Sequence, residues 1–128
     1  MAGAAGRRLS GETDLVTLIA AMRPVLHAAR YRFETGHAAP PDAFAIIHED
    51  EATTIIAPAP DGNWARISLS VHSSLSAVGL SAAIAKALAD RGISANIVAG
   101  YYHDHIFVQW DKRHEAMSAL HILSETKS

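Results

Sequence analysis

Hydrophobic residues in the second half of the chain recur first with a period of two and then with a helical period. The alternating stretch from 67 to 71 predicts a strand with one buried face. The run AVGLSAAIAKALADRG that follows predicts a helix that ends at Gly92, with Ile93 placed for the hydrophobic contact of a helix C-cap. The residues expected on one face of this helix are Ser81, Ile84, Ala85 and Leu88.

Two further strands and a closing helix complete this half. Residues 93–99 and 105–110 predict strands joined by the turn GYYHDH, and residues 112–124 carry apolar side chains at helical spacing. In the second of these strands, Ile106 and Val108 should face opposite to His105 and Phe107. The order β-α-β-β-α predicts an α+β fold of ferredoxin-like type with an antiparallel sheet, helices on one face and the last strand missing. We expect the first half of the chain to supply that strand.

The first half opens with a Gly/Ala-rich stretch that predicts a disordered tail over residues 1–9. A short helix should then begin at Thr13 or Asp14 and stop before Pro24. Its apolar stripe is Leu15, Leu18, Ile19 and Met22. The strands expected next are Tyr31 to Thr35, Phe44 to His48 and Thr53 to Ala57. The breaker cluster from Pro58 to Gly62 is interpreted as a joint, which divides the chain into units 10–62 and 63–128.

Composition narrows the class of protein. The 128 residues are 49% hydrophobic and 19% charged, which favours a folded domain over a disordered chain. The formal charge of -2 and the lack of a basic run exclude a nucleic-acid binder. No apolar run is long enough to span a bilayer, so a cytoplasmic protein is expected. Cysteine is absent, which excludes thiolate chemistry, and no cofactor is expected.

The predicted topology gathers polar groups at one end of the sheet. His72, the turn from Tyr101 to Asp104, His105 and the start of the helix near Ala77 should meet there. The free N–H groups of that helix start favour a carboxylate or phosphate, and serines at 73, 74 and 76 stand just before it. The alternative is that one serine only caps the helix. On the uncovered face of the sheet the same geometry aligns Ser68, Ser70, Asn96 and Phe107.

The triplet His103-Asp104-His105 allows a metal-site interpretation, with His72 as a third ligand. A solvated aspartate turn flanked by histidines is the favoured alternative, and direct contact with a ligand is a third. No Ser-His-Asp set and no pair of carboxylates indicates catalysis, so neither catalytic nor metal-binding residues are assigned.

Three stretches carry a resemblance to a known family: SGETDL, VHSSLSAVGLSAAIAKAL and GISANIVAGYYHDHIFV. They resemble small bacterial ACT-domain-containing proteins, an ACT-like family of unknown function. The resemblance implies two ACT-like units in tandem and a regulatory, ligand-sensing role. Better-known ACT domains bind amino acids at subunit interfaces. By that analogy, and adding two histidines of the turn region, the ligand-binding candidates are His72, Ser73, Ser74, Leu75, Val78, Gly79, Asn96, Ile97, His103 and His105.

The sequence therefore predicts a non-enzymatic module that binds a small, amino-acid-like ligand with its carboxylate facing the helix start. A homodimer is expected, because the chain is small and one face of its sheet should be exposed. The contact is expected either between sheet edges or between helices. Two alternatives stay open: a structural or protein-interaction module without a ligand, and a His-dependent metal-binding enzyme that uses His72, His103 and His105.

Overall fold

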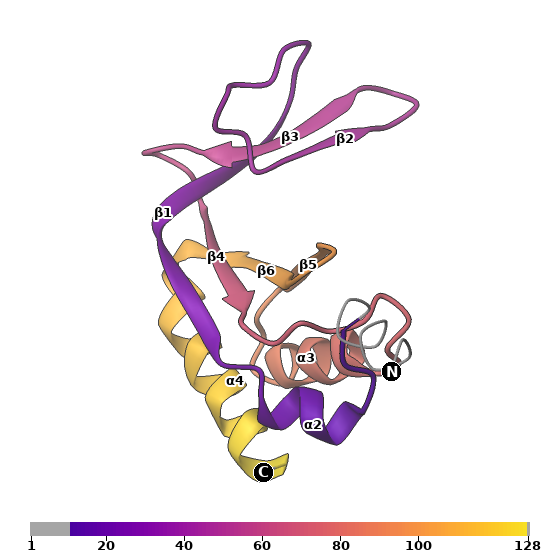
Figure 1. The fold of residues 1–128 in the computed structure, drawn as a ribbon. Helices are drawn as coiled ribbons and strands as arrows, with labels where there is room; N and C mark the ends of the chain where they lie inside the picture. Colours follow the sequence, from indigo (N-terminus) through magenta and orange to yellow (C-terminus); the bar gives the residue numbers. More distant parts are fainter. Residues whose placement is uncertain (1–10, 128) are drawn as a thin grey trace.

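The structure, a computed structural model, describes residues 11–127, so the predicted tail lies outside the described residues. The described chain forms one six-stranded antiparallel sheet in the order β2-β3-β1-β4-β6-β5, with helices at one side (Figure 1). The elements are α2 (Leu15–Ala20), β1 (Pro24–Thr35), β2 (Ala45–His48), β3 (Thr53–Pro58), β4 (Trp64–Leu69), α3 (Leu80–Ala89), β5 (Asn96–Ala99), β6 (Asp104–Gln109), the 3-10 turn η1 (Trp110–Lys112) and α4 (Arg113–Lys127).

The second half folds in the predicted β-α-β-β-α order. Strand β6 lies between β4 and β5 and is antiparallel to both, with Ser68 opposite His105 and Ala99 opposite Asp104. Strand β1 pairs with the free edge of β4, also antiparallel. It therefore occupies the place of the strand that the second half lacks, which confirms that the first half completes the ferredoxin-like sheet.

Helices α2, α3 and α4 cover one face of the sheet and enclose the main core. Leu18 of α2, Leu88 of α3 and Leu120 of α4 are fully buried against Ile67 and Ile106 of the sheet. Removing this apolar surface from water is the main stabilising contribution to the fold. The described helices include none that is long and apolar enough to cross a membrane.

The expected face of α3 is confirmed at Ile84 and Leu88 and wrong at Ser81 and Ala85. Leu80, Ile84 and Leu88 are buried, whereas Ser81 and Ala85 are exposed. The helix also begins at Leu80 rather than near Ala77. Leucine and isoleucine recur there every fourth residue, and burying them removes more apolar area from water than burying a serine and an alanine would.

The predicted start of α2 and the predicted end of α3 are confirmed. The Asp14 carboxylate accepts a hydrogen bond from the backbone N–H of Thr17 at 3.0 Å and caps α2. After α3, Gly92 takes a left-handed conformation with φ 71°, and the N–H of Ile93 donates to the Leu88 carbonyl at 3.0 Å. Ile93 is 3% exposed, as the hydrophobic contact of a helix C-cap requires.

Strand β1 is longer than predicted and joins the two halves of the sheet. It begins at Pro24 rather than Tyr31, because proline fits the first position of a strand, where its missing N–H costs no ladder bond. An irregularity between Leu26 and Arg30 interrupts the alternation of inward- and outward-facing residues, so the sequence pattern does not predict the first part of the strand. Residues 31–35 pair with β3, whereas β4 pairs with the earlier part of the strand.

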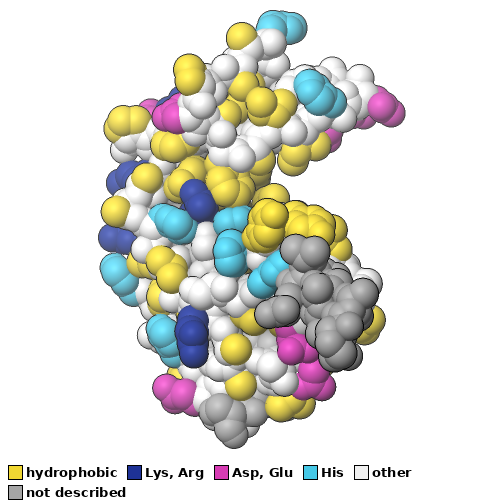
Figure 2. Space-filling model, in the orientation of Figure 1, with side chains coloured by type: hydrophobic (Ala, Val, Ile, Leu, Met, Phe, Trp, Pro, Cys, Tyr) yellow, Lys and Arg dark blue, Asp and Glu magenta, His cyan; other side chains and the backbone are white. Residues whose placement is uncertain are grey.

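The sheet curls, so side chains from its own outer strands cover part of the face that carries no helices. The ring of Phe44, next to β2, lies 5.5 Å from the ring of Phe107 in β6, although β3, β1 and β4 separate those strands. Tyr31 and Ile56 complete the buried part of this second cluster. In Figure 2 apolar and histidine side chains gather at the hollow beneath the arm formed by β2 and β3.

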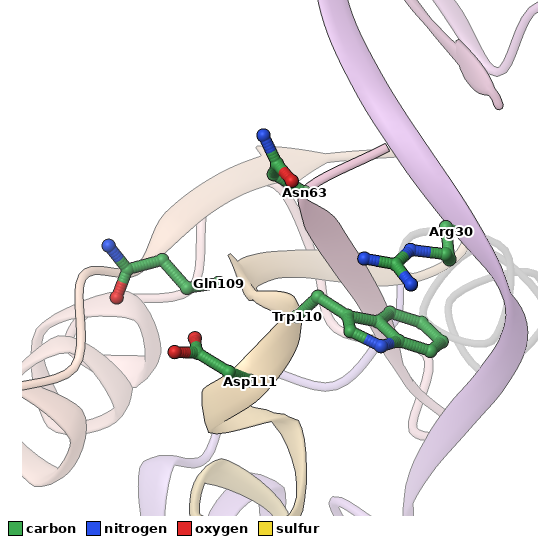
Figure 3. A pocket seen from close by; sticks show the side chains of 5 residues that line it. All are labelled: Arg30, Asn63, Gln109, Trp110 and Asp111. Atoms are coloured by element: carbon green, nitrogen blue, oxygen red, sulfur yellow. The ribbon is translucent and has the colours of Figure 1, made fainter. Parts of the chain in front are cut away.

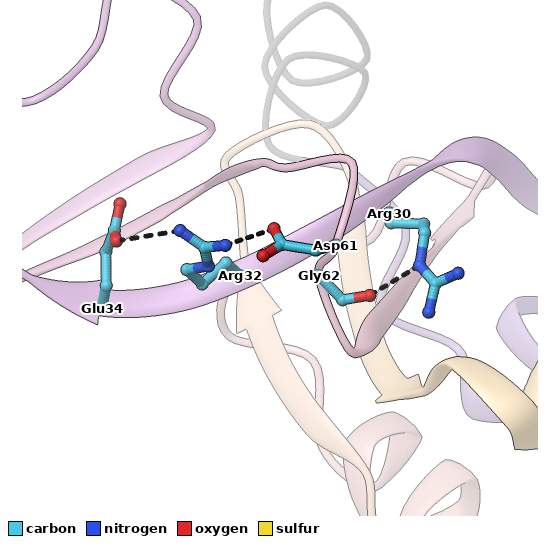
Figure 4. Close-up of polar contacts among 5 residues, drawn as sticks. All are labelled: Arg30, Arg32, Glu34, Asp61 and Gly62. Carbon is cyan, nitrogen blue, oxygen red and sulfur yellow. Dashed lines mark hydrogen bonds and ion pairs between the residues drawn. The ribbon is translucent and has the colours of Figure 1, made fainter.

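The loop from 59 to 63, interpreted from sequence as a joint, is held against β1. Arg30 donates through Nε to the Gly62 carbonyl at 2.7 Å, and Arg32 pairs with Asp61 (Figure 4). A Cβ at Gly62 would lie 2.2 Å from the Tyr31 carbonyl oxygen, so only glycine allows this approach. The loop therefore has a fixed position where it connects β3 to β4.

Candidate ligand site at the start of α3

The segment between β4 and α3 is held by the chain just before α2. The N–H of Glu12 donates to the His72 carbonyl at 2.9 Å, and the N–H of Ser74 donates to the Glu12 carbonyl at 2.8 Å. A Cβ at Gly11 would lie 2.7 Å from the Ser73 carbonyl carbon, so the close pairing requires glycine. Residues 11–15 and 71–79 therefore form one structural unit, although about sixty residues separate them in the sequence.

A cavity of about 120 Å³ opens between this segment, the start of α3 and the β5–β6 end of the sheet. Asp104 lines it and is 8% exposed, and its Oδ2 accepts a 2.9 Å hydrogen bond from the hydroxyl of buried Ser73. A solvated aspartate turn is therefore the wrong interpretation for Asp104. The lining residues are Ser73, Ser74, Leu75, Ala77, Gly79, Leu80, Ser81, Ala99 and Asp104.

No serine caps α3, so the alternative that one of the serines serves only as a helix cap is also wrong. Gly79 occupies the N-cap position with φ 101°, and no side-chain hydrogen bond caps the helix start. The Ser74 hydroxyl instead accepts from the Ser76 N–H at 3.2 Å and lies 2.9 Å from the Ser76 hydroxyl. The first N–H groups of α3 therefore remain without a capping side chain beside the cavity.

Some of the predicted site residues line the cavity, and the others lie elsewhere in the fold. Ser73, Ser74, Leu75 and Gly79 line the cavity. Val78 is 83% exposed. Asn96 lies opposite Phe107 at the other end of β5 from Ala99, the residue of that strand which lines the cavity. Ile97 packs on the core beneath the helices.

The three histidines of the metal-site interpretation do not converge. The ring of His72 lies 5.4 Å from the Tyr102 ring, its buried Nε2 has no hydrogen-bond partner in the described chain, and His103 is exposed in the turn. His105 lies on the helix-free face, as its register predicts. Over residues 11–127 no group of three or more histidine or carboxylate side chains could hold a metal ion.

His105 belongs to a row of hydrogen bonds across three strands that the sequence did not predict. Ser68 Oγ lies 2.7 Å from His105 Nδ1 and 2.7 Å from His27 Nε2. Because a serine hydroxyl has one hydrogen, one imidazole accepts it and the other donates its own N–H. Loss of solvent, followed by the charge of Arg66, lowers the pKa of His105 to about 4, and the same two causes lower the pKa of His27.

This row predicts lower stability in acid. The unfolded chain takes up a proton on His105 near the ordinary pKa of 6.5, whereas the folded protein keeps it neutral until about pH 4. The unfolded state therefore binds more protons in this window, and the free energy of unfolding falls as the pH drops from 6.5 towards 4. Urea unfolding at several pH values measures the trend. His105→Gln should flatten it and His114→Gln, on the exposed side of α4, should not; equal slopes would contradict the assignment.

The contribution of Gly11 and Glu12 to this site has no signal in the sequence. There the motif SGETDL indicates only a helix start and a family resemblance. The motif also holds the segment between β4 and α3 in place, through an isolated parallel pairing between Glu12 and Ser73. A pairing of single residues produces no periodic pattern in the sequence. The burial of Asp104 could not be predicted from the sequence either, because its hydrogen-bond partner Ser73 is distant in the chain.

Comparisons with known proteins identify the family. One ACT-domain model matches residues 10–72 and another ACT-domain model matches residues 61–122. The crystal structure of a Vibrio cholerae protein of unknown function, described as a possible transport protein, is 40% identical with a TM-score of 0.70. That match covers 82% of this chain and 92% of the Vibrio chain. No curated protein matched the sequence.

More distant structures share the fold. An Agrobacterium tumefaciens protein is 16% identical with a TM-score of 0.58, over 73% of this chain and 81% of its own. The ligand-free regulatory subunit of aspartate kinase from Thermus thermophilus is 12% identical with a TM-score of 0.63, over 80% of this chain and 97% of its own. The protein belongs to the ACT-domain family and contains tandem ACT domains. ACT domains are regulatory modules that bind small ligands.

Proposed function

We propose that this protein is a non-enzymatic regulatory protein that binds a small α-amino acid in the cavity at the start of α3. One observation carries the proposal: a buried carboxylate and an uncapped helix start line the same cavity. The Asp104 carboxylate would accept the ligand's ammonium group. The N–H groups at the start of α3 would donate to its carboxylate, where the helix dipole also favours negative charge.

The size of the cavity supports a small ligand. Its volume of about 120 Å³ is below the roughly 300–1,000 Å³ of pockets that hold drug-sized molecules. Leu75 and Ala77 offer apolar surface, and the serine hydroxyls offer polar contacts. Glycine, alanine, serine and threonine are therefore the amino acids to test first.

Thermal unfolding with a panel of amino acids tests the proposal. At least one small amino acid should raise the melting temperature, with a stabilisation that grows as RT ln(1 + [L]/Kd). Ser74→Asp should abolish the shift, because a second carboxylate at the cavity would repel that of the ligand. Ser118→Asp, on the exposed side of α4, is the matched control and should keep the shift. A panel that leaves the transition unmoved at millimolar concentration would favour a structural module without a ligand.

The proposal includes a homodimer. In the described sheet β2 and β5 are the two edge strands, and β2 exposes Ile46 and Ile47 by 49% and 44%. Edge strands with exposed apolar side chains pair readily with another chain. Sedimentation velocity should therefore give about twice the chain mass of 13.6 kDa; a single-chain mass at all concentrations would contradict this part of the proposal.

A further inference from the structure

A second cavity lies at the opposite end of β4 and β6 from the candidate ligand site. It has a volume of about 480 Å³ and is lined by Arg30, Asn63, Gln109, Trp110 and Asp111 (Figure 3). Asn63 and Gln109 lie at the ends of β4 and β6 that are remote from Asp104. The two cavities therefore have no lining residue in common, and variants of one leave the walls of the other intact.

Arg30 is held in a fixed position at this second cavity. Its Nε donates to the Gly62 carbonyl at 2.7 Å, and its guanidinium carbon lies 4.7 Å from the centre of the Trp110 ring. The Gly62 loop is itself held to β1, since the Ala59 N–H donates to the Arg30 carbonyl at 2.9 Å. The two terminal nitrogens of Arg30 have no hydrogen-bond or ion-pair partner within residues 11–127. A guanidinium fixed in this way presents two parallel N–H donors, the geometry that binds a carboxylate.

Trp110 is equally well fixed. Its backbone N–H donates to the Asn63 carbonyl at 2.8 Å, and the guanidinium carbon of Arg113 lies 3.9 Å from its ring centre. Arg113 also donates through Nη1 to the Trp110 carbonyl at 2.8 Å. The cavity wall is therefore organised before any ligand arrives, which lowers the entropy lost on binding.

The charges and amides define the ligand. Among the lining residues Arg30 carries a positive charge and Asp111 a negative one. The guanidinium of Arg113, which lies on the Trp110 ring, adds a second positive charge nearby, so the surroundings of the cavity suit a single anionic group. Asn63 and Gln109 each offer an amide that both donates and accepts, and Asp111 only accepts. Hydroxyl groups satisfy all three. We propose that this cavity binds a small hydroxy acid, with its carboxylate on Arg30 and its hydroxyls on Asn63, Gln109 and Asp111.

The test uses D-gluconate as the hydroxy acid, with acetate and inorganic phosphate as comparison probes. The chain has two tryptophans, so Trp64→Phe leaves Trp110 as the only one and its emission reports on the cavity. Gluconate should change this emission saturably at millimolar concentration, and acetate and phosphate should bind more weakly. Titration calorimetry on the unmodified chain gives the same ranking without dependence on the variant.

Arg30→Gln should weaken gluconate binding by about tenfold to a hundredfold, because a charged two-point contact is lost. Arg32→Gln is the matched control: the residue lies two positions along the same strand and pairs with Asp61 outside the cavity lining, so binding should be unchanged. No saturable response to gluconate, equal binding by Arg30→Gln, or tighter binding of phosphate than of gluconate would each overturn the proposal. None of these results depends on the amino-acid site, since gluconate lacks an ammonium group.

Discussion

Phe107→Ala is expected to lower the free energy of unfolding by about 3–5 kcal/mol. The side chain is fully buried, and its ring lies 5.3 to 5.5 Å from the rings of Tyr31, Phe33 and Phe44. These rings come from the first half of the chain, so the substitution removes the contact that joins the arm of β2 and β3 to β6. Urea unfolding followed by circular dichroism measures the loss.

The control for this experiment is Tyr102→Ala. Tyr102 is also aromatic, but it is 64% exposed, so its removal should change the free energy of unfolding by about 0.5 kcal/mol or less. A loss below about 1 kcal/mol for Phe107→Ala would mean that the sheet does not curl over its helix-free face.

Gly62→Ala is the second large effect, with an expected loss of about 3 kcal/mol, at the upper end of the range for overpacking. The new Cβ would lie 2.2 Å from the Tyr31 carbonyl oxygen and 2.9 Å from its amide nitrogen. These are backbone atoms of a paired strand, so neither can move without breaking ladder bonds. The loop must shift instead, and with it the hydrogen bond from Arg30 to the Gly62 carbonyl.

Gly92→Ala separates this steric effect from a conformational one. Gly92 has φ 71°, but a Cβ added there would meet no atom within 4 Å, so alanine encounters only the cost of the left-handed conformation. That cost is about 1–2 kcal/mol. Chemical unfolding of both variants should rank Gly62→Ala as the more harmful, and the reverse order would contradict the close approach of the loop to β1.

The second half of the fold is predictable because its signals are local and periodic. Strand β4 and helix α3 each have one buried face, and Gly92 marks a helix end with a specific backbone requirement. Strand β1 is longer than its sequence pattern predicts because its irregularity between Leu26 and Arg30 breaks the alternation. The curl of the sheet could not be predicted, since it depends on contacts such as Phe44 with Phe107 between distant segments.

The candidate site is predictable in outline only. Connectivity brings Ser73 and Asp104 to one end of the sheet, and the structure confirms their meeting. The sequence could not indicate that the N-cap residue of α3 is Gly79 rather than a serine, because serine is a more common N-cap than glycine. The displacement of Asn96 from the cavity follows from the register of β5 against β6, which no residue pattern in this short strand specifies.

The proposed amino-acid site requires the ligand's ammonium on Asp104 and its carboxylate at the start of α3. Titration calorimetry of the small amino acid that stabilises the protein most, beside its N-acetyl derivative and its methyl ester, examines both contacts together. The parent amino acid should bind and both derivatives should fail, and Asp104→Asn should weaken the parent by about tenfold or more. Equal binding of the parent and its derivatives, or binding unaffected by Asp104→Asn, would contradict this mode of recognition.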